Sequence, residues 1–333
     1  MSEGEGIEVL TRPPVSPGFS LAWLLDAWRL DRQIRCARPN LFHAFFQWNL
    51  PLWRLPMPSV GHVYDLMPLA LEEFYVRRGG LAVGRKIHLY RRYLKYALGR
   101  LDRVITISEH SRRDLVRLMG FRQERIHVVH PAPAPGMKSA HDPARMSHLR
   151  SRLGLPESYL LYVGGYDYRK NVETLLDAHV SARKQGLGLS LVLAGGMESP
   201  YGRRIAERAW GTPGVLLPGH IPEEDLPTLY AGARLVLYPS LYEGFGLPVL
   251  DAMACGVPVI CSSAPSLAEA AGNAVLRLPP GEKEAWAEAM CRAEEESFCE
   301  DLRRRGLSHV KKFSWERAAR ETLRVYEAVA GGA

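Results

Sequence analysis

Apolar residues in the second half of the chain form short continuous runs that alternate with segments of helical period. The runs fall at residues 159–163, 189–193, 215–217, 235–238 and 258–261. Helical segments are expected near residues 172–184, after Gly195-Gly196, and at residues 223–231 and 247–255. Continuous apolar strands that alternate with helices are typical of a parallel sheet covered on both faces. Ligands of such sheets bind at the carboxyl ends of the strands, and the loops there are rich in Gly, Pro and Ser.

The pattern in the first half is weaker but of the same kind. Strands are predicted at residues 40–43, 59–63, 104–107 and 126–129, and helices at residues 20–35, 85–101 and 109–119. The helix at residues 85–101 is amphipathic. Its apolar stripe consists of Ile87, Tyr90, Leu94, Leu98 and Leu101, and the residues away from the stripe include Arg85, Arg92 and Lys95.

A proline-rich segment separates the two halves. Pro131-Ala-Pro-Ala-Pro135 opens a linker that runs to about His148, which predicts one domain over residues 1–140 and a second over residues 141–313. A last helix, at residues 314–330, is expected to begin at Ser314 as its N-cap and to pack back toward the first domain.

Composition narrows the class of protein. The 333 residues suffice for two domains, and 47% hydrophobic with 24% charged residues is typical of a globular chain. The five cysteines contain no Cys-x-x-Cys, no apolar stretch reaches the length of a membrane span, and the first residues do not resemble a signal peptide. We therefore expect a cytoplasmic protein, with contact to the inner face of the membrane left open.

The positive charge is concentrated in one zone. Residues 77–125 hold fourteen Lys and Arg against four Asp and Glu, a net of +10, so the remainder carries −3 of the total of +7. Such a zone favours an anionic partner, namely a membrane surface, a phosphorylated acceptor or nucleic acid. A solvated arginine-rich helix face would give the same pattern. Because no motif that reads bases accompanies the zone, we expect no nucleic acid, and peripheral contact of residues 77–125 with an anionic membrane or a lipid-phosphate acceptor stays open.

The most informative stretch runs from Pro239 to Ile260 and is predicted to be strand, glycine loop, helix, turn and strand. Gly244 and Gly246 allow a backbone to approach a ligand closely. The helix behind them directs free N–H groups at the loop, which suits a pyrophosphate. Glu243 precedes the glycines and Asp251 lies within the helix, so two acids can flank a phosphate and accept hydrogen bonds from sugar hydroxyls.

This stretch resembles retaining glycosyltransferase family 4, and the Lys170-Asn171 pair of a second element resembles its mannosyltransferase-like members. The resemblance rests on the two acids, Glu243 and Asp251, within Pro-Ser, Gly-Phe-Gly-Leu-Pro and Ala-x-Gly-x-Pro-Val elements. It implies that Glu243 contacts the transferred sugar and that Asp251, where the family usually has Glu, holds the ribose. The donor site it implies includes Glu243, Gly244, Phe245, Gly246, Leu247 and Asp251.

A second element matches the same family. Val163-Gly-Gly-Tyr-Asp-Tyr-Arg-Lys-Asn171 resembles its Val-Gly-x-x-x-x-x-Lys-Asn, in which Lys170 neutralises the donor diphosphate as a point charge. Gly164 and Gly165 then belong to the donor site. Many relatives have Arg at the place of Gly165, and Arg169 is a candidate to compensate, although a solvent-facing arginine would look the same. We expect Lys170 and Glu243 to lie on the open cleft, where truncation costs no core packing and leaves the fold intact.

Further elements of the resemblance are shorter. The turn Gly219-His220-Ile221 is similar to the one whose backbone binds the nucleobase. His62-Val-Tyr-Asp-Leu-Met-Pro68 resembles a strand end at the acceptor side, with Asp65 matching and Tyr64 at the place of the usual His. His62, Tyr64 and Asp65 are therefore candidate catalytic residues, with His62 supporting the other two from behind or serving only as a core histidine. Glu269 matches a recurrent element without a clear role.

The resemblance implies the GT-B fold, in which two doubly wound Rossmann-like α/β domains face each other across a cleft. Here the N-terminal domain is expected to be incomplete, because the family's first strand and glycine-rich loop have no counterpart before Ser20. The implied activity is retaining transfer of a hexosyl group from a GDP- or UDP-linked sugar to a glycan, lipid-linked or small-molecule acceptor.

The sequence also bears on metal dependence and on alternative functions. No Asp-x-Asp occurs, so we expect no metal and no other cofactor. Two readings stay open, a donor-binding subunit that turns over poorly alone and another two-domain α/β enzyme such as an epimerase or a phosphorylase.

Overall fold

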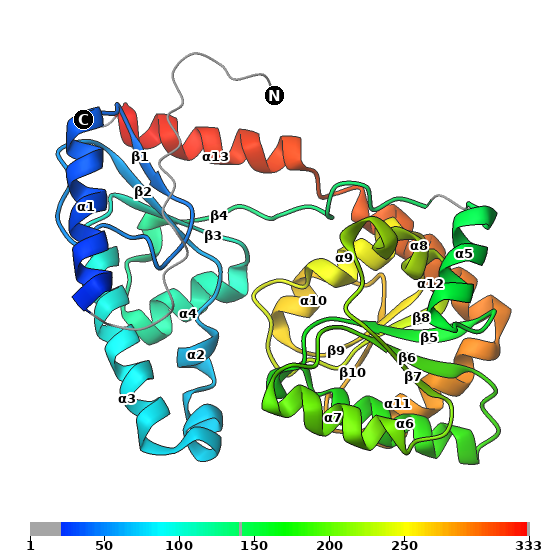
Figure 1. The fold of residues 1–333 in the computed structure, drawn as a ribbon. Coiled ribbons are helices and arrows are strands. Elements are labelled where there is room, and N and C mark those ends of the chain that lie inside the picture. Colours follow the sequence, from blue (N-terminus) through cyan, green and yellow to red (C-terminus); the bar gives the residue numbers. More distant parts are fainter. Residues whose placement is uncertain (1–20, 140–141, 332–333) are drawn as a thin grey trace. The chain divides into compact units, whose positions relative to one another are not determined.

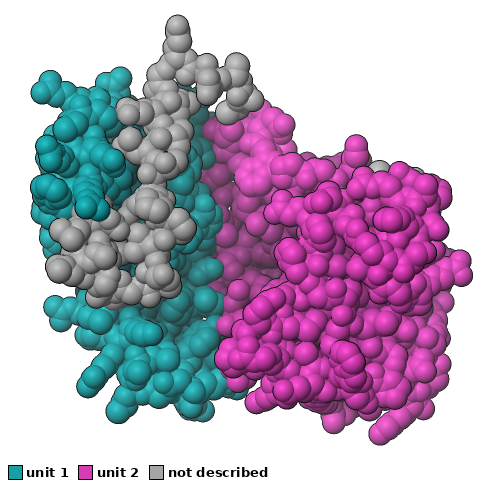
Figure 2. Space-filling view, in the orientation of Figure 1, with its two compact units in different colours: residues 1–106, 112–128, 321–333 teal, residues 107–111, 129–320 magenta. Residues whose placement is uncertain are grey.

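The computed structural model describes residues 21–139 and 142–331, with side chains from residue 28 onward. The chain divides into two compact units (Figures 1 and 2). Unit 1 comprises Met1–Thr106, Arg112–Val128 and Glu321–Ala333, and unit 2 comprises Ile107–Ser111 and Val129–Arg320. The passage into unit 2 lies at Val129, whereas the proline-rich segment led us to expect it near residue 140.

Unit 2 is built on a parallel six-stranded sheet with the strand order β10-β9-β8-β5-β6-β7. The strands are β5 (Tyr159–Val163), β6 (Ser190–Ala194), β7 (Val215–Gly219), β8 (Ala233–Tyr238), β9 (Val259–Ser262) and β10 (Leu276–Leu278). The chain order runs outward from β5 to β7 and then reverses to β8, β9 and β10. The sheet is therefore doubly wound, with its switch point between β5 and β8.

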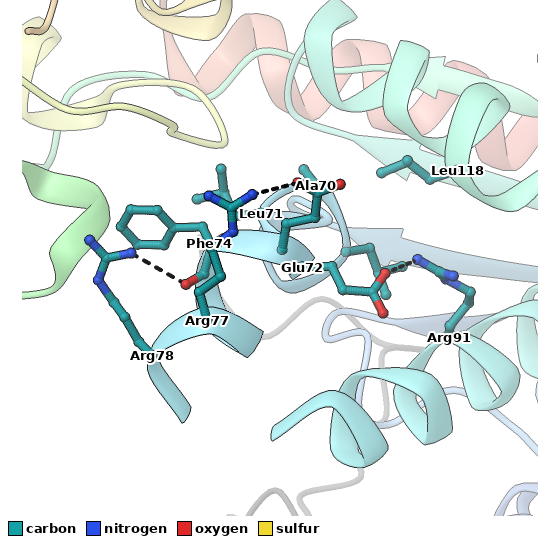
Figure 3. A pocket seen from close by; sticks show the side chains of 10 residues that line it. Ala70, Leu71, Glu72, Phe74, Arg77, Arg78, Arg91 and Leu118 are labelled. Carbon is teal, nitrogen blue, oxygen red and sulfur yellow. Dashed lines mark hydrogen bonds and ion pairs between the residues drawn. The ribbon is translucent and has the colours of Figure 1, made fainter. Parts of the chain in front are cut away.

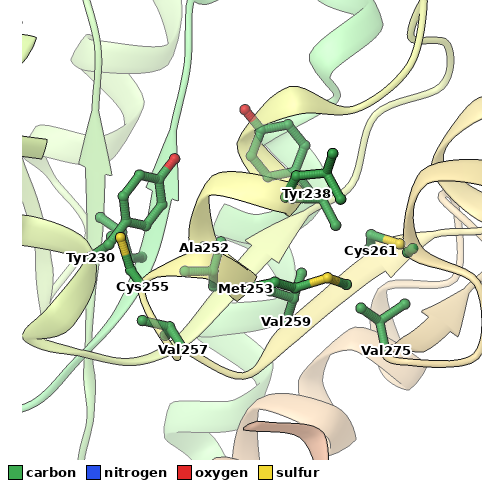
Figure 4. Close-up of a cluster of buried hydrophobic side chains, with 14 of the residues drawn as sticks. Tyr230, Tyr238, Ala252, Met253, Cys255, Val257, Val259, Cys261 and Val275 are labelled. Carbon is green, nitrogen blue, oxygen red and sulfur yellow. The ribbon is translucent and has the colours of Figure 1, made fainter. Parts of the chain in front are cut away.

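Successive strand residues point to opposite sides of this sheet, so both faces are apolar, and helices cover both. On one face Tyr159, Leu161 and Tyr238 pack with α5 (Pro143–Leu153), α8 (Leu226–Ala231), α9 (Leu247–Ala254) and α10 (Pro265–Ala271) (Figure 4). On the other face Leu160 and Tyr162 pack with α6 (Val172–Lys184), α7 (Pro200–Trp210) and α11 (Lys283–Cys291). The prediction of an α/β domain with two covered faces is confirmed.

The remaining elements of unit 2 are connections and the C-terminal region. The short 3-10 helices are η2 (Tyr168–Lys170), η3 (Glu223–Asp225) and η4 (Arg292–Glu294). Helix α12 (Glu296–Val310) packs against α9. Helix α13 (Trp315–Ala330) begins one residue after Ser314, whose hydroxyl accepts a hydrogen bond from the Arg317 N–H, and from Glu321 onward it belongs to unit 1.

Unit 1 contains a parallel four-stranded sheet whose order, β1-β2-β3-β4, follows the chain. Its strands are β1 (Phe42–Ala44), β2 (Ser59–Val63), β3 (Arg103–Thr106) and β4 (Ile126–Val128). Its helices are α1 (Leu21–Ala37), α2 (Met67–Ala70), α3 (Glu72–Leu98) and most of α4 (Glu109–Met119), with a 3-10 turn η1 (Gln123–Arg125). In the described part of this unit the strand order shows no reversal. The loop that we expected to be missing would fall within residues 1–20, outside the described residues.

Helix α3 is longer than its predicted counterpart at residues 85–101. It begins at Glu72 and contains a corner at Gly80, whose backbone angles (φ 66°, ψ −163°) are not helical. The predicted apolar stripe is buried as expected, with Ile87, Leu94 and Leu98 in the core of unit 1. The glycine pair 79–80 concealed the first part of the helix, because glycine usually ends a helical pattern.

Candidate functional site

The loops that follow β5 and β8 meet at the switch point of unit 2, where sheets of this kind bind their ligands. Gly164 follows β5, and its N–H donates to the Ala194 carbonyl at the end of β6. Gly195 (φ 152°) follows β6, and a Cβ placed there would lie 1.9 Å from the Gly164 carbonyl oxygen. Only glycine at position 195 permits this approach, which brings the two strand ends together.

Three charged residues from these two loops form one cluster. Lys170 Nζ donates to Glu243 Oε1 at 2.6 Å, and an Arg169 guanidinium N–H donates to Glu243 Oε2 at 2.8 Å. The hydroxyl of Ser240 also donates to Oε1, at 2.7 Å. The sequence elements around Lys170 and Glu243 are thus brought together, and Arg169 contacts the cluster rather than solvent alone.

Both Glu243 and Lys170 are largely buried, with side-chain exposures of 10% and 12%. Both are therefore more enclosed than the prediction of an open cleft implied, because each packs against its oppositely charged partner. Burial raises the pKa of Glu243, but the adjacent Lys170 and Arg169 together with the hydrogen bonds outweigh it and lower the pKa below its usual value. Glu243 is consequently an anion at neutral pH.

Asn171 fixes the backbone next to this cluster. In the sequence it was part of the Lys-Asn element, but no role was predicted for it. Asn171 adopts a left-handed conformation (φ 55°), and its side-chain amide donates to the carbonyls of Pro239 and Pro280 at 3.2 and 2.7 Å. Asp167 caps the preceding turn by accepting the Arg169 N–H at 2.9 Å. Asn171 thereby connects the loop after β5 to the ends of β8 and β10.

The glycine loop leads directly into α9. The N-cap residue is Gly246 (φ 124°), which has no side chain to accept a hydrogen bond, so the first N–H groups of α9 have no side-chain cap. A Cβ at Gly246 would lie 2.6 Å from Leu267 Cδ2, which explains the need for glycine. The Gly244 carbonyl accepts the Ser108 hydroxyl at 2.7 Å, and Ser108 belongs to unit 2. The side chain of Phe245 is buried in the core, whereas Leu247 is 38% exposed.

Asp251 lies one turn into α9 and does not contact the Glu243 cluster through any hydrogen bond in the described residues. Its Oδ1 accepts the Ala134 N–H at 2.8 Å. Burial raises the pKa of Asp251 to about 6, although the hydrogen bond from Ala134 opposes the shift. A carboxyl with one oxygen engaged by the backbone retains the other for a hydroxyl donor such as a ribose.

The turn after β7 closes the same edge of the sheet. Gly219 (φ 79°) accepts the Gly195 N–H through its carbonyl at 2.8 Å, so this turn lies beside the one after β6. His220 is exposed and Ile221 is buried in the core. At the end of β5, Gly165 has open space around the position of a Cβ.

Glu269 belongs to a sequence element for which no role was predicted, and its contacts in the structure indicate a positioning role. Its carboxylate accepts the N–H groups of Glu109 and His110 at 2.7 and 3.1 Å and is 2.7 Å from His130 Nε2. Burial raises the pKa of Glu269, but these hydrogen bonds lower it overall. The ring of His130 stacks on Phe245 at 5.3 Å. Glu269 therefore positions residues 107–111 and the glycine loop of unit 2.

The three candidate residues of unit 1 lie at the carboxyl end of β2. Asp65 Oδ1 accepts the Met67 N–H at 3.0 Å and so holds the first residue of α2. Tyr64 is 36% exposed, and its ring stacks on His62 at 4.5 Å. Both ring nitrogens of His62 are buried without a hydrogen-bond partner among the described residues, and burial lowers its pKa to about 4. The geometry of His62 fits support of Tyr64 from behind.

Comparison with known proteins identifies the family of this chain. The family description "Glycosyltransferase Family 4" matches residues 2–132, and "Glycosyl transferases group 1" matches residues 148–309. O-antigen chain mannosyltransferase B of Escherichia coli is 33% identical over 312 residues, which cover 91% of this chain and 80% of that protein. This chain belongs to glycosyltransferase family 4.

Other members of the family are similar over smaller shares of their length. Serotype-specific mannosyltransferase WbdA of Escherichia coli is 27% identical over 81% of this chain but 33% of its own length, so the chain spans about a third of it. D-inositol 3-phosphate glycosyltransferase of Nocardioides sp. is 31% identical over 68% of this chain and 53% of its own length. The expectation of a glycosyltransferase is confirmed.

Solved structures support the fold. Sucrose-phosphate synthase from Thermosynechococcus elongatus superposes with a TM-score of 0.74 at 24% identity and covers 92% of this glycosyltransferase, which covers 78% of it. Anabaena HepE in complex with UDP and glucose gives a TM-score of 0.72 at 19% identity, with 95% of this chain and 84% of that chain covered. Both likenesses show the GT-B class of α/β fold that the sequence predicted.

Proposed function

We propose that this glycosyltransferase moves a mannosyl group from a GDP- or UDP-linked donor to a glycan acceptor, with retention of anomeric configuration and without a metal ion. The observation that carries the proposal is the cluster of Glu243, Lys170 and Arg169 at the switch point of unit 2. It brings together a buried anion, two cations and a glycine loop at the start of a helix.

The two cations fit a donor diphosphate. Lys170 has three N–H donors, and its hydrogen bond to Glu243 leaves the others for phosphate oxygens. With Glu243 ionised, the three side chains carry a net charge of +1, to which the uncapped N-terminus of α9 adds a partial positive charge. The charge that develops on the leaving group is then met by protein groups that are already in place, which is the basis for proposing a metal-independent reaction.

Glu243 is proposed to accept hydrogen bonds from the hydroxyls of the transferred sugar. In the proposed step the bond between the anomeric carbon and the phosphate oxygen breaks, and the acceptor oxygen forms its bond on the same face. The acceptor proton passes to the departing phosphate. Asp251 is proposed to bind the ribose through the oxygen that Ala134 does not occupy, and the turn at residues 219–221 to bind the base. Tyr64 and Asp65 are proposed to contribute from unit 1.

The choice of sugar and acceptor follows from relatives. Two of the curated relatives in Escherichia coli are named mannosyltransferases, and one of them acts by its name on an O-antigen chain. We therefore propose a role in bacterial polysaccharide synthesis, with a glycan on a lipid carrier as acceptor. Such an acceptor would place the enzyme in the cytoplasm at the inner face of the membrane.

A panel of GDP-mannose, UDP-glucose, ADP-glucose and dTDP-glucose tests the donor. The true donor nucleotide at a hundredfold its Kd should stabilise the protein by about 2.7 kcal/mol. The same donor should be slowly hydrolysed, and Glu243→Gln should abolish hydrolysis while binding persists. Binding without hydrolysis or transfer would favour the donor-binding subunit, and stabilisation by none of the four would contradict the proposal.

A further inference from the structure

Two phenylalanines at the carboxyl edge of the sheet in unit 1 expose their rings. Phe45 and Phe46 follow β1 directly and are 65% and 48% exposed. Tyr64, which is 36% exposed, follows the adjacent parallel strand β2. Two neighbouring strands therefore present three aromatic rings at the edge where parallel sheets bind their ligands. These rings lie on loops, and no helix in the described residues is long and apolar enough to cross a membrane.

The three rings belong to one row. The ring centres of Phe45 and His43 lie 4.1 Å apart. At the other end of the row, the ring centres of Phe46 and Tyr64 lie 6.1 Å apart. His62 joins the two pairs, at 5.9 Å from His43 and 4.5 Å from Tyr64. Separations of this size are typical of aromatic rings in contact, so the row is continuous.

Hydrogen bonds fix both ends of the row. The Nδ1 atom of His43 forms a hydrogen bond of 2.6 Å with the Tyr326 hydroxyl of α13, within unit 1. At the other end, the Asn49 N–H donates to the Phe46 carbonyl at 2.8 Å and closes a turn. Rings that are already ordered lose little conformational freedom when a ligand covers them, so the row is a preorganised surface.

The loops that carry the row contain no cation. The sequence has no Lys or Arg at residues 39–53 or 59–76, which include the loops after β1 and β2. The same edge carries the carboxylate of Asp65, directly after Tyr64. A phosphorylated ligand would therefore meet an acid and no guanidinium or ammonium group on either loop, although such groups are what phosphates bind. The composition of this edge favours an uncharged ligand.

A hollow of about 510 Å³ in unit 1 does contain arginines, but they have partners of their own (Figure 3). It is lined by α2 and the first part of α3. Arg91 pairs with Glu72 at 2.5 Å, and Arg77 lies 3.7 Å from Glu73. The Arg78 guanidinium donates to a backbone carbonyl at 3.4 Å. Two carboxylates thus offset two of these three cations, so we assign no phosphate to this hollow.

A sugar ring fits the aromatic row. One face of a pyranose carries C–H groups with a small positive charge, whereas the face of an aromatic ring is negative, so the two attract each other. Stacking also removes apolar surface from water. The hydroxyls at the rim of the sugar stay available to polar groups, which suits an edge that combines exposed rings with a carboxylate.

We propose that Phe45 and Phe46, together with Tyr64, stack on the terminal sugar of an uncharged glycan acceptor and so select it over a phosphorylated acceptor. Because an acceptor presupposes transfer, this assignment rests on the proposed function. It adds the residues that hold the acceptor and the class of acceptor that they admit.

Acceptor kinetics test the selection. Methyl α-mannoside and methyl α-mannoside 6-phosphate share one ring and differ by a phosphate group. The parent should use the uncharged mannoside with a kcat/KM about tenfold higher or more, because the phosphate meets an acid and no cation on these loops. Phe45→Ala and Phe46→Ala should each raise the KM for the mannoside roughly fivefold, and Phe46→Trp, which keeps an aromatic face, should retain the parent KM. Donor hydrolysis without acceptor should keep its parent rate in all three variants, because the donor cluster lies in unit 2.

Saturation-transfer NMR measures acceptor binding without turnover. The parent should transfer saturation to the C–H protons of methyl α-mannoside, and Phe45→Ala/Phe46→Ala should lose most of that signal. Tyr96→Ala removes a ring of similar exposure (49%) from α3 and is the matched control, which should behave like the parent. Because these side chains are exposed, all variants should unfold thermally close to the parent.

Failure of the stacking surface differs from failure of the proposed function. No donor hydrolysis or transfer by the parent would contradict the proposed function, whereas saturation transfer that depends on Phe45 and Phe46 would still support the stacking surface. Parent-like KM and saturation transfer in the double variant, equal losses in Tyr96→Ala, or preference for the phosphorylated mannoside would overturn the proposal. Self-association of the parent that the double variant abolishes, with acceptor binding unchanged, would assign the rings to a contact between copies and would also overturn it.

Discussion

The buried cluster in unit 2 predicts that Glu243→Ala destabilises the protein more than Lys170→Ala. Without Glu243, the cations Lys170 and Arg169 remain side by side with side-chain exposures of 12% and 21% and lose their shared anion. Removing one partner of a buried pair costs about 3–5 kcal/mol. Without Lys170, Glu243 keeps Arg169 at 2.8 Å and Ser240 at 2.7 Å, so we expect a smaller loss of about 1–3 kcal/mol.

The double variant Lys170→Ala/Glu243→Ala should lose less than the sum of the two single losses, because the residues touch. We expect a coupling free energy of about 1–3 kcal/mol. Urea unfolding measures all three variants, with Lys184→Ala at the exposed end of α6 as a control that should stay within about 0.5 kcal/mol of the parent. Donor hydrolysis, measured where each variant is folded, should fall by about 10²–10³ in both single variants.

Two outcomes of the unfolding measurements are incompatible with a buried, coupled ion pair. Parent-like stability of Glu243→Ala would mean that its carboxylate does not neutralise a buried pair of cations. Strict additivity of the single variants would mean that Lys170 and Glu243 do not interact in the folded protein. Near-normal turnover in either single variant would remove that residue from catalysis while leaving its structural role in place.

Three further predictions concern Asp251, the need for a metal ion, and the pair of Tyr64 and His62. Asp251 has a raised pKa of about 6, so the folded state binds more protons than the unfolded state between about pH 4 and 6 and stability falls as pH rises through that window. Asp251→Asn should remove this dependence of stability on pH and stabilise the protein at pH 7 by roughly 1–3 kcal/mol, while the KM for the donor rises. Urea unfolding of parent and variant at pH 4.5 and 7.5 measures the dependence, and the same slope in both proteins would contradict the prediction. Transfer should persist in EDTA, and a strict requirement for Mg²⁺ or Mn²⁺ would show that the cations at Glu243 do not suffice. Tyr64→Phe should lower turnover, and Tyr64→His should retain it. His62→Phe should keep activity and raise the free energy of unfolding by about 1 kcal/mol, because two unpaired buried nitrogens are removed. Parent-like turnover of all three variants would exclude this strand end from catalysis.

Much of unit 2 could be predicted because its signals are local. Strand β5 and helix α6 have the bounds that the apolar pattern indicated, since a continuous apolar run and a helical stripe are both visible within a short window. Lys170 and Glu243 were both assigned to one donor site from two motifs, but the hydrogen bond between them was not predicted. Their burial did not follow, because enclosure depends on loops such as the one that Asn171 holds against Pro280.

Long-range polar contacts could not be predicted at all. The hydrogen bond between Asp251 and Ala134 joins residues 117 positions apart, and the contact of His130 with Glu269 spans 139 positions. Neither pair leaves a periodic pattern or a motif in the sequence. The corner at Gly80 was missed for the opposite reason, because a glycine pair that normally ends a helix here joins two arms of one element.

Proton NMR of donor turnover distinguishes retention from inversion at the anomeric carbon. The protein is incubated with GDP-mannose or the donor that stabilises it, in the presence and absence of a mannoside acceptor, and the anomeric signal of the first product is followed before mutarotation. We expect the α-configured donor to give an α-configured product, and Glu243→Gln to form none. A β-configured first product would contradict retention, and turnover at the parent rate in Glu243→Gln would contradict the site itself.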